Sequence, residues 1–316
     1  MNETVPGTVS AIVMTLNAEK YIKSMLDMLK RQTRPVGEII VADSESDDKT
    51  VSIAENYDKV KIVTIKRSEF DHGGSRDYAL KQSSGDFVLF FTQDAVIGSD
   101  DYIENLIANF VDENVAMVCG RQIAKEGAYP YEKLIREFNY PDRHIVRTEA
   151  DIETMGIKAF YMSDACSAYR RTAYFEIGGF EYPLLTNEDM LIASHAIRGG
   201  YKTVYEPKAY VYHSHNYKYR QEFKRNFDVA AFMVMHEKEF EGIDETGEGF
   251  SLVKYVSVRL LKKLKIIWFI RFGFICVAKF TGNRKGKKIR SMSMDEILKN
   301  TSLPSYWKRN PDALKG

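Results

Sequence analysis

Three apolar segments near the N-terminus each run into residues that can bind a ligand. The polar ends are Thr15, Leu16 and Asn17 after the first segment, Asp43 and Ser44 after the second, and Thr92, Gln93 and Asp94 after a later one. In open parallel sheets, ligands bind outside the carboxyl ends of the strands. A single aspartate there is usually a cap or turn residue. Three such ends on one edge indicate instead a ligand site built with carboxylates.

Several common nucleotide and acyl-transfer motifs are absent from the sequence. No GxGxxG follows the first apolar segment, and neither GxxxxGK[ST] nor GxSxG occurs. These absences argue against a nicotinamide-binding Rossmann domain, a P-loop NTPase and a serine hydrolase with a nucleophile elbow. The site is therefore expected to hold its ligand with carboxylates, and with a metal if one is present, rather than with a glycine-rich phosphate loop.

Strand-like and helix-like segments alternate in the first half of the chain, the pattern of a mostly parallel sheet flanked by helices. The pattern weakens over residues 127–160. Strands are predicted over 8–15, 38–42, 60–65, 86–92, 115–120, 202–205 and 209–213. Helices are predicted over 18–31, 49–57, 76–83, 187–198 and 218–240. The predicted fold class is α/β.

The composition is that of a globular protein with a basic C-terminal segment. The 316 residues are 44% hydrophobic and 28% charged, which excludes a disordered tail protein, a collagen-like repeat and a disulfide-stapled miniature. The formal net charge is +1, but residues 251–290 hold 12 Lys or Arg and no acidic residue. The rest of the chain therefore has 33 basic against 44 acidic residues, a balance of −11.

Residues 250–281 predict an amphipathic helix with a basic polar face. Apolar residues recur at helical spacing, and basic residues occupy the other half of the wheel. The apolar residues are Val253, Val256, Leu260, Leu264 and Ile267, followed by Trp268, Phe269, Phe272 and Phe274. The basic residues are Lys254, Arg259, Lys262, Lys263 and Lys265. This composition is typical of an interfacial membrane segment. A packed helix with solvated lysines, or a self-association surface, fits the same pattern.

A spanning helix and an exported protein are not expected. The most apolar stretch, residues 264–280, is interrupted by Lys265, Arg271 and Lys279. The N-terminus has no basic region followed by an apolar stretch. The three cysteines, Cys119, Cys166 and Cys276, form no CxxC pair and fit a reducing cytoplasm. Nucleic-acid binding is not expected, because the basic tail lacks a recognised module.

Six segments occur in the order seen in family 2 glycosyltransferases of the GT-A fold, which the chain resembles over residues 8–225. They are VSAIVMTLN, EIIVADSESDDKT, FDHGGSRDYAL, FVLFFTQDA, EIGGFEYPLLTNEDM and AYVYHSH. Within this family, the chain looks most like bacterial rhamnosyltransferases of cell-surface polysaccharide synthesis. The segments that carry this closer resemblance are RSEFDHGGSRDYAL, TQDA, HSH and the late KFTGNRKGKK. The resemblance implies a GT-A domain over 1–225 and a helical C-terminal region over 226–316, whose basic segment covers about 250–290.

The resemblance also implies how a nucleotide-sugar donor is bound. Asp43 matches the aspartate that accepts the N3–H of uracil or thymine, and Thr15, Leu16 and Asn17 match the segment lining the base and ribose. Arg76 is placed to contact the diphosphate or ribose. The remaining donor-binding residues are Ser44, Gly74, Thr92, Gln93 and Asp94.

A divalent cation, Mg²⁺ or Mn²⁺, is implied by Asp94, which matches the last aspartate of the family's DxD motif. Thr92 stands where the first aspartate usually is, which puts the contact made there in doubt and predicts weaker metal dependence. His213 matches a position where family members place an imidazole ligand, with His215 as its alternative two residues on. Oxygen and imidazole ligands suit such a cation acting as a Lewis acid.

The catalytic base implied by the resemblance is Asp189, with Glu188 helping to position it. Asp164 is implied to build the floor on the acceptor side. A base opposite the leaving group predicts inversion at the anomeric carbon.

The predicted function is transfer of L-rhamnose from dTDP-β-L-rhamnose to a lipid-linked saccharide, at the inner face of the cell membrane. A UDP-hexose or UDP-N-acetylhexosamine donor is an alternative, because Asp43 meets the same N3–H in uracil and thymine. A non-catalytic membrane-associated nucleotide-sugar binder is the alternative from another class. A homo-oligomer remains open.

Overall fold

A computed structural model describes residues 5–243 and 247–314 of the chain. The chain forms two compact units. The first comprises residues 1–125, 140–182 and 188–213, and the second comprises 126–139, 183–187 and 214–316.

The first unit is built on a mixed sheet. Among the described residues it has nine strands, in the order β3-β2-β1-β4-β8-β6-β9-β5, with β7 paired to β9. The strands are β1 (Val9–Thr15), β2 (Glu38–Asp43), β3 (Val60–Thr64), β4 (Phe87–Thr92), β5 (Val96–Ile97), β6 (Val115–Ile123), β7 (Ile145–Arg147), β8 (Cys166–Arg170) and β9 (Lys202–Tyr212).

The half of the sheet formed by β3, β2, β1 and β4 is parallel, as predicted. Thr15 pairs with Asp43 across β1 and β2, and Met14 pairs with Thr92 across β1 and β4. The three polar strand ends therefore meet at one edge of the sheet. β8 runs antiparallel to both β4 and β6, which ends the regular alternation of the first half. The two strands predicted over 202–205 and 209–213 form the single strand β9.

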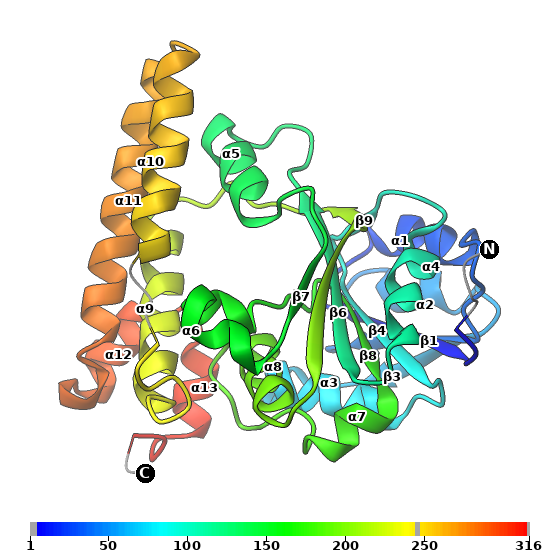
Figure 1. Ribbon diagram of the computed structural model, residues 1–316. Helices are drawn as coiled ribbons and strands as arrows, with labels where there is room; N and C mark the ends of the chain where they lie inside the picture. The colour runs from blue at the N-terminus through cyan, green and yellow to red at the C-terminus, as the bar shows by residue number, and fades with distance from the viewer. Residues whose placement is uncertain (1–4, 244–246, 315–316) are drawn as a thin grey trace. The chain divides into compact units, whose positions relative to one another are not determined.

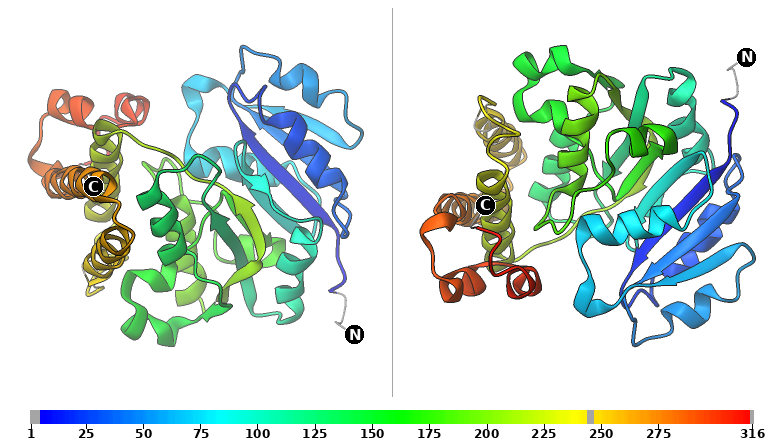
Figure 2. Two further views of the ribbon diagram at one scale, coloured as in Figure 1. Left: turned by 90° about the horizontal axis from the view of Figure 1, so that it is seen from above. Right: turned by 90° about the horizontal axis from the view of Figure 1, so that it is seen from below.

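Helices cover both faces of this sheet (Figure 2), and all seven residues of β1 are accordingly buried. The helices of this unit are α1 (Ile22–Lys30), α2 (Thr50–Ala54), α3 (His72–Lys81), α4 (Tyr102–Ile107), α6 (Ile152–Met155), α7 (Arg171–Glu176) and α8 (Glu188–Arg198). Cys119 and Cys166 are buried in the core.

Helix α3 begins four residues before its predicted start. The side chain of Asp71 accepts a hydrogen bond from the backbone N–H of Gly74 and so caps the helix. A Cβ atom at Gly73 would lie 2.5 Å from the carbonyl oxygen of Glu181. The double glycine therefore marks a close backbone approach inside the first helical turn rather than a break before it.

The second unit is helical, and α10 and α11 lie side by side (Figure 1). Its helices are α5 (Pro130–Asn139), α9 (Tyr219–Met235), α10 (Gly247–Lys262), α11 (Ile266–Gly286), α12 (Met294–Asn300) and α13 (Pro304–Arg309). The helix predicted over 250–281 is thus a hairpin, because the chain turns at Leu264, whose φ is 52°. Val256 and Leu260 pack against Tyr131 of α5 and Phe272 of α11.

Helix α11 packs closely against α9. A Cβ atom at Gly282 or Gly286 would collide with the carbonyl oxygen of Phe223 or Phe227, so only glycine allows this approach. By length and composition alone, α11 is able to cross a membrane, although Phe272, Ile275 and the two glycines are buried within the unit.

Candidate active site

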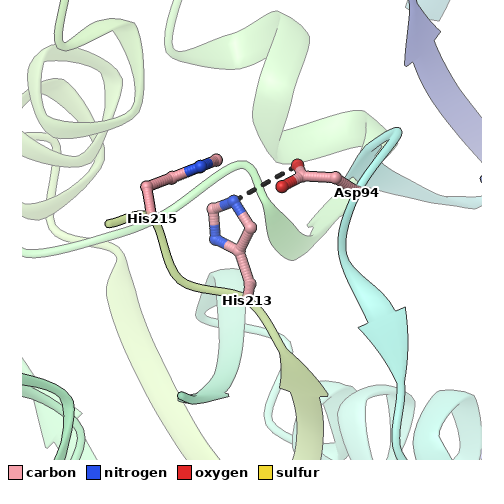
Figure 3. Close-up of side chains that lie close together, drawn as sticks. All are labelled: Asp94, His213 and His215. Atoms are coloured by element: carbon pink, nitrogen blue, oxygen red, sulfur yellow. Dashed lines mark ion pairs between the residues drawn. The ribbon is translucent and has the colours of Figure 1, made fainter. Parts of the chain in front are cut away.

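Two strand ends bring a carboxylate and an imidazole together at one edge of the sheet. Asp94 follows β4 by two residues, and His213 directly follows β9. The Nε2 atom of His213 lies 3.4 Å from Oδ1 of Asp94. One ligand atom from each of Asp94, His213 and His215 lies within 4.8 Å of the others. Figure 3 shows the three side chains and the ion pair between Asp94 and His213.

This group fits a divalent cation. An octahedral ion with ligands at about 2.1 Å spaces neighbouring ligand atoms about 3 Å apart. The 3.4 Å between the Asp94 and His213 atoms is close to that spacing. Their side chains are only 16% and 12% exposed, so competing water is limited. Asp94 and His213 would hold the ion, with His215 as the third ligand.

Gln122, which no sequence motif singles out, orients His213. Its Oε1 accepts a hydrogen bond from Nδ1 of His213 at 2.9 Å, and its Nε2 donates to Oγ of Ser163 at 2.7 Å. Because Gln122 holds the Nδ1 proton, Nε2 of His213 faces Asp94, where it donates to the carboxylate when protonated and can bind a metal ion once that proton is lost. Gln122 reaches His213 because β6 pairs with β9.

Lys125 is a second residue that sequence reasoning missed. Its Nζ donates to Oδ2 of Asp94 at 2.7 Å. Burial alone would raise the pKa of Asp94, but the hydrogen bonds and charges of His213 and Lys125 outweigh it and hold that pKa well below its usual range. Asp94 is therefore a carboxylate at neutral pH.

Asp43, at the end of β2, is held in place by Thr15 of β1 and by Ser46 of the loop that follows β2. Its Oδ1 accepts from Thr15 Oγ1 at 2.8 Å and Ser46 Oγ at 2.6 Å, and its Oδ2 accepts from Ser46 N at 2.8 Å. Each carboxylate oxygen has two lone pairs, so Oδ2 retains one acceptor position. Asp43 and Ser44 are only 2% and 3% exposed.

The loop after β1 is tied to the loops that follow its two neighbours. Gln93 accepts from Leu16 N at 2.7 Å and donates to Leu16 O at 3.1 Å. Asn17, at φ 54°, accepts from Asp47 N at 2.9 Å. The hydroxyl of Thr92 is buried, and no hydrogen-bond partner is found for it among the described residues. The side chains of Gln93 and Asn17 thus shape the predicted donor-binding loops.

A second polar cluster lies where α3 meets the start of α8. Glu188 and Asp189 occupy the first turn of α8. Arg76 Nη1 lies 3.0 Å from Glu188 Oε1, and its Nε lies 3.6 Å from Asp164 Oδ2. The backbone N–H of Asp164 donates to Asp189 Oδ2 at 3.4 Å. The guanidinium thus pairs with two carboxyl groups, and a backbone N–H contacts the third.

Burial and the Arg76 charge shift the pKa values of these three carboxyl groups in different directions. Burial and the charges of Glu188 and Asp164 raise the pKa of Asp189 well above its usual value, against the lowering effect of Arg76. Burial likewise raises the pKa of Asp164 to about 6, opposed by Arg76. For Glu188, the charges of Arg76 and His72 outweigh burial and lower the pKa. Asp189 is therefore the group most ready to take up a proton.

Three predicted ligand contacts look different in the structure. Arg76, with a side chain 6% exposed, pairs with carboxylates and donates to His72 O rather than facing open space. Asp164 is 2% exposed and accepts from the hydroxyls of Ser167 and Tyr169. The N–H of Gly74 serves the cap of α3. These residues build the acidic cluster, and their contacts with donor or acceptor remain predictions.

Polar contacts and a short stretch of backbone join the two clusters. The contacts run from Asp94 to His213, from His213 to Gln122, and from Gln122 to Ser163. Ser163 precedes Asp164, whose N–H contacts Asp189. The fold therefore links the predicted metal ligands to the predicted base, although Asp94 and Asp189 are 95 positions apart in the sequence.

Comparison with known proteins finds two relatives that match most of the chain. The chain is 38% identical over 303 residues to the O-antigen chain rhamnosyltransferase RfbN of Salmonella typhimurium, covering 95% of this chain and 96% of the relative. It is 38% identical over 282 residues to the O-antigen chain rhamnosyltransferase WbaN of Salmonella anatum, covering 88% of each.

Solved structures show the same fold at lower identity. The mannosyltransferase PcManGT from Pyrobaculum calidifontis, in complex with GDP-Man and Mn²⁺, superposes with a TM-score of 0.60 at 17% identity, covering 90% of this chain and 89% of that one. Residues 1–349 of Staphylococcus aureus TarS, in complex with UDP, superpose with a TM-score of 0.53 at 22% identity, covering 80% of this chain and 72% of that one.

The model of Glycosyl transferase family 2 matches residues 10–178, more than half of the chain. With this match and the GT-A fold, the chain belongs to glycosyl transferase family 2 and is a glycosyltransferase.

Proposed function

We propose that the protein is an inverting rhamnosyltransferase that uses dTDP-β-L-rhamnose and acts in cell-surface polysaccharide synthesis. The observation that carries this proposal is the similarity to two O-antigen chain rhamnosyltransferases over most of the chain. The proposed acceptor is a lipid-linked saccharide.

In this proposal, the edge formed by β1 and β2 binds the nucleotide. The remaining acceptor position on Asp43 Oδ2 takes the N3–H of thymine, while Thr15, Leu16, Asn17 and Ser44 line the base and ribose. Because the hydrogen bonds from Thr15 and Ser46 already fix the Asp43 carboxylate, binding the base costs little reorganisation.

In this proposal, dTDP departs at the Asp94 and His213 cluster, and the acceptor hydroxyl is deprotonated at Asp189. A bound Mg²⁺ or Mn²⁺ would act as a Lewis acid on the diphosphate. Asp94 and His213 orient that end of the site, and the Asp189 carboxylate removes the proton from the acceptor hydroxyl. Attack from the face opposite the leaving group inverts the anomeric centre, so a β-L-rhamnosyl donor gives an α-L-rhamnoside.

The test is thermal stabilisation and transfer with purified protein across dTDP-β-L-rhamnose, UDP-glucose and UDP-N-acetylglucosamine, each with and without Mn²⁺. Stabilisation and turnover are expected with the dTDP sugar. Turnover with a UDP sugar alone would assign the other donor class. Binding of a nucleotide sugar without turnover on any lipid-linked acceptor would favour a non-catalytic binder.

We further propose that the α10–α11 hairpin holds the protein on the inner face of the membrane. An exposed apolar stripe runs along α11 at helical spacing, formed by Ile267, Ile270, Phe274, Val277 and Phe280, which are 53–74% exposed. Basic residues border both ends of the stripe, with Lys262, Lys263 and Lys265 at one end and Arg284, Lys285, Lys287 and Lys288 at the other. Apolar side chains flanked by cations suit an anionic lipid surface. Because the opposite side of α11 packs inside its unit, a peripheral position fits better than a spanning one.

Replacing Lys262, Lys263 and Lys265 with serine is expected to weaken binding to phosphatidylglycerol vesicles by about 10²-fold. Each lysine near an anionic leaflet contributes about 1 kcal/mol. Co-sedimentation with vesicles measures the change, and the exposed lysines Lys30, Lys49 and Lys59 of the first unit provide the matched triple control. Unchanged vesicle binding would refute the membrane proposal. A dimer that forms without lipid and is lost in Phe274→Ser would assign the stripe to a second copy of the chain.

A further inference from the structure

We propose that Lys125 is an internal cation that occupies Asp94 until a divalent ion arrives and then binds the diphosphate of the nucleotide sugar. The inference rests on the proposed function, because it needs Asp94 to be a metal ligand. Nothing in the sequence motifs assigns a role to Lys125.

The starting observation is the position of Asp94 between two basic groups. Its Oδ2 accepts from Lys125 Nζ at 2.7 Å, and its Oδ1 faces His213 Nε2 at 3.4 Å. The side chains of Lys125 and Asp94 are 25% and 16% exposed, so water screens their ion pair only in part. Lys125 follows β6 by two residues, just as Asp94 follows β4 by two.

Lys125 and a divalent ion compete for the same carboxylate. An ammonium group hydrogen-bonded to Oδ2 takes one of the two oxygens that the ion would use, and two cations sharing one carboxylate repel each other. Ion binding therefore requires the ammonium group to move away. The flexible four-carbon stem of lysine allows this movement, and the ring of Tyr21, 5.7 Å from Nζ, offers a nearby face that attracts a cation.

The diphosphate is the natural destination for the displaced ammonium group. The donor brings a negatively charged diphosphate to the ion held by Asp94, and its charge grows as the sugar departs. Lysine binds phosphate as a point charge. Thr92 is neutral, whereas an aspartate at this position would add a second negative charge beside Asp94. Lys125 therefore has no acidic side chain at position 92 that would compete with phosphate for its charge.

This mechanism predicts opposite effects on two binding constants. In Lys125→Met, Mn²⁺ alone should bind about tenfold more tightly, because the competing ammonium group is gone. The same variant should bind dTDP about tenfold more weakly at saturating Mn²⁺, because a charge-assisted hydrogen bond to phosphate is lost. Lys125→Arg, which keeps the positive charge, should bind dTDP like the wild type. Isothermal titration calorimetry measures both constants.

The control variant is Lys23→Met, which removes an exposed lysine that is also ion-paired to an aspartate, Asp27 on α1. It should change neither constant, and thermal unfolding confirms that each variant is folded. If both constants of Lys125→Met change in the same direction, or neither changes, the inference about Lys125 is wrong. If Asp94→Asn still binds Mn²⁺ like the wild type, the metal site of the proposed function is itself wrong.

Discussion

Asp189→Asn is expected to lower the transfer rate by about 10²–10⁴-fold, the range that a positioned general base contributes. Asparagine keeps the size of the side chain and the acceptor atom that Met190 N uses, but it takes up no proton. Donor binding should change little, because the loops proposed to bind the nucleotide follow β1, β2 and β4, whereas Asp189 lies in the first turn of α8. Turnover at saturating donor and acceptor, compared with the dTDP affinity, separates the two effects.

The pH dependence of the same enzyme provides an independent check. Burial, Glu188 and Asp164 raise the pKa of Asp189, and a base works only when ionised. Activity should therefore fall as the pH drops through that raised pKa, well above the value of about 4 usual for aspartate. The control is Asp77→Asn, a buried aspartate bonded to Tyr174 and Lys81. Wild-type turnover in Asp189→Asn, or an acidic limb near pH 4, would remove Asp189 from the mechanism.

Arg76→Met should reduce the free energy of unfolding by about 3–5 kcal/mol, because it leaves buried carboxylates without their cation. The guanidinium lies 3.0 Å from Glu188 and 3.6 Å from Asp164, and its side chain is 6% exposed. Urea unfolding measures the loss. Lys81→Met on the same helix removes a half-exposed ion pair with Asp77 and should cost at most about 1 kcal/mol.

The stability loss in Arg76→Met should depend on pH with a defined sign. Without the guanidinium, the folded-state pKa of Asp164, which burial already raises to about 6, rises further, and burial raises that of Glu188 above its unfolded value. Such groups destabilise the fold when ionised, so the loss should be larger at pH 8 than at pH 5. Arg76→Lys, which keeps a charge but loses the planar fork, should recover part of the stability. A loss that is equal at both pH values would show that packing, and not charge, is the role of Arg76.

The sequence was sufficient to predict the parallel half of the sheet, because apolar runs ending in polar residues define β1, β2 and β4. Beyond residue 100 it was sufficient for single elements such as β6, α8 and α9, but not for the strand order, since the antiparallel insertion of β8 depends on which strands pair. The hairpin of α10 and α11 was missed because its amphipathic spacing continues across the turn at Leu264.

Site residues that stand at element ends could be predicted from the sequence, and those that meet their partners only through tertiary structure could not. Asp43, Asp94 and Glu188-Asp189 stand at element ends, where a pattern in the sequence marks them. Gln122 and Lys125 lie at the end of β6 and just beyond it, and they meet His213 and Asp94 only through tertiary structure. The resemblance implies a donor contact for Arg76, which stays a prediction, and the pairing of its side chain with Glu188 depends on the approach of α3 to α8.

The path from Asp94 through Gln122 to Asp189 has a consequence for how the enzyme tolerates change. In the proposed mechanism, leaving-group departure and deprotonation of the acceptor depend on one set of linked residues, so a substitution at one end should also misalign the other. The penalties of combined substitutions at the two ends should therefore fall short of the product of the single ones. Redesign for a new acceptor is better directed at loops outside this scaffold than at its members.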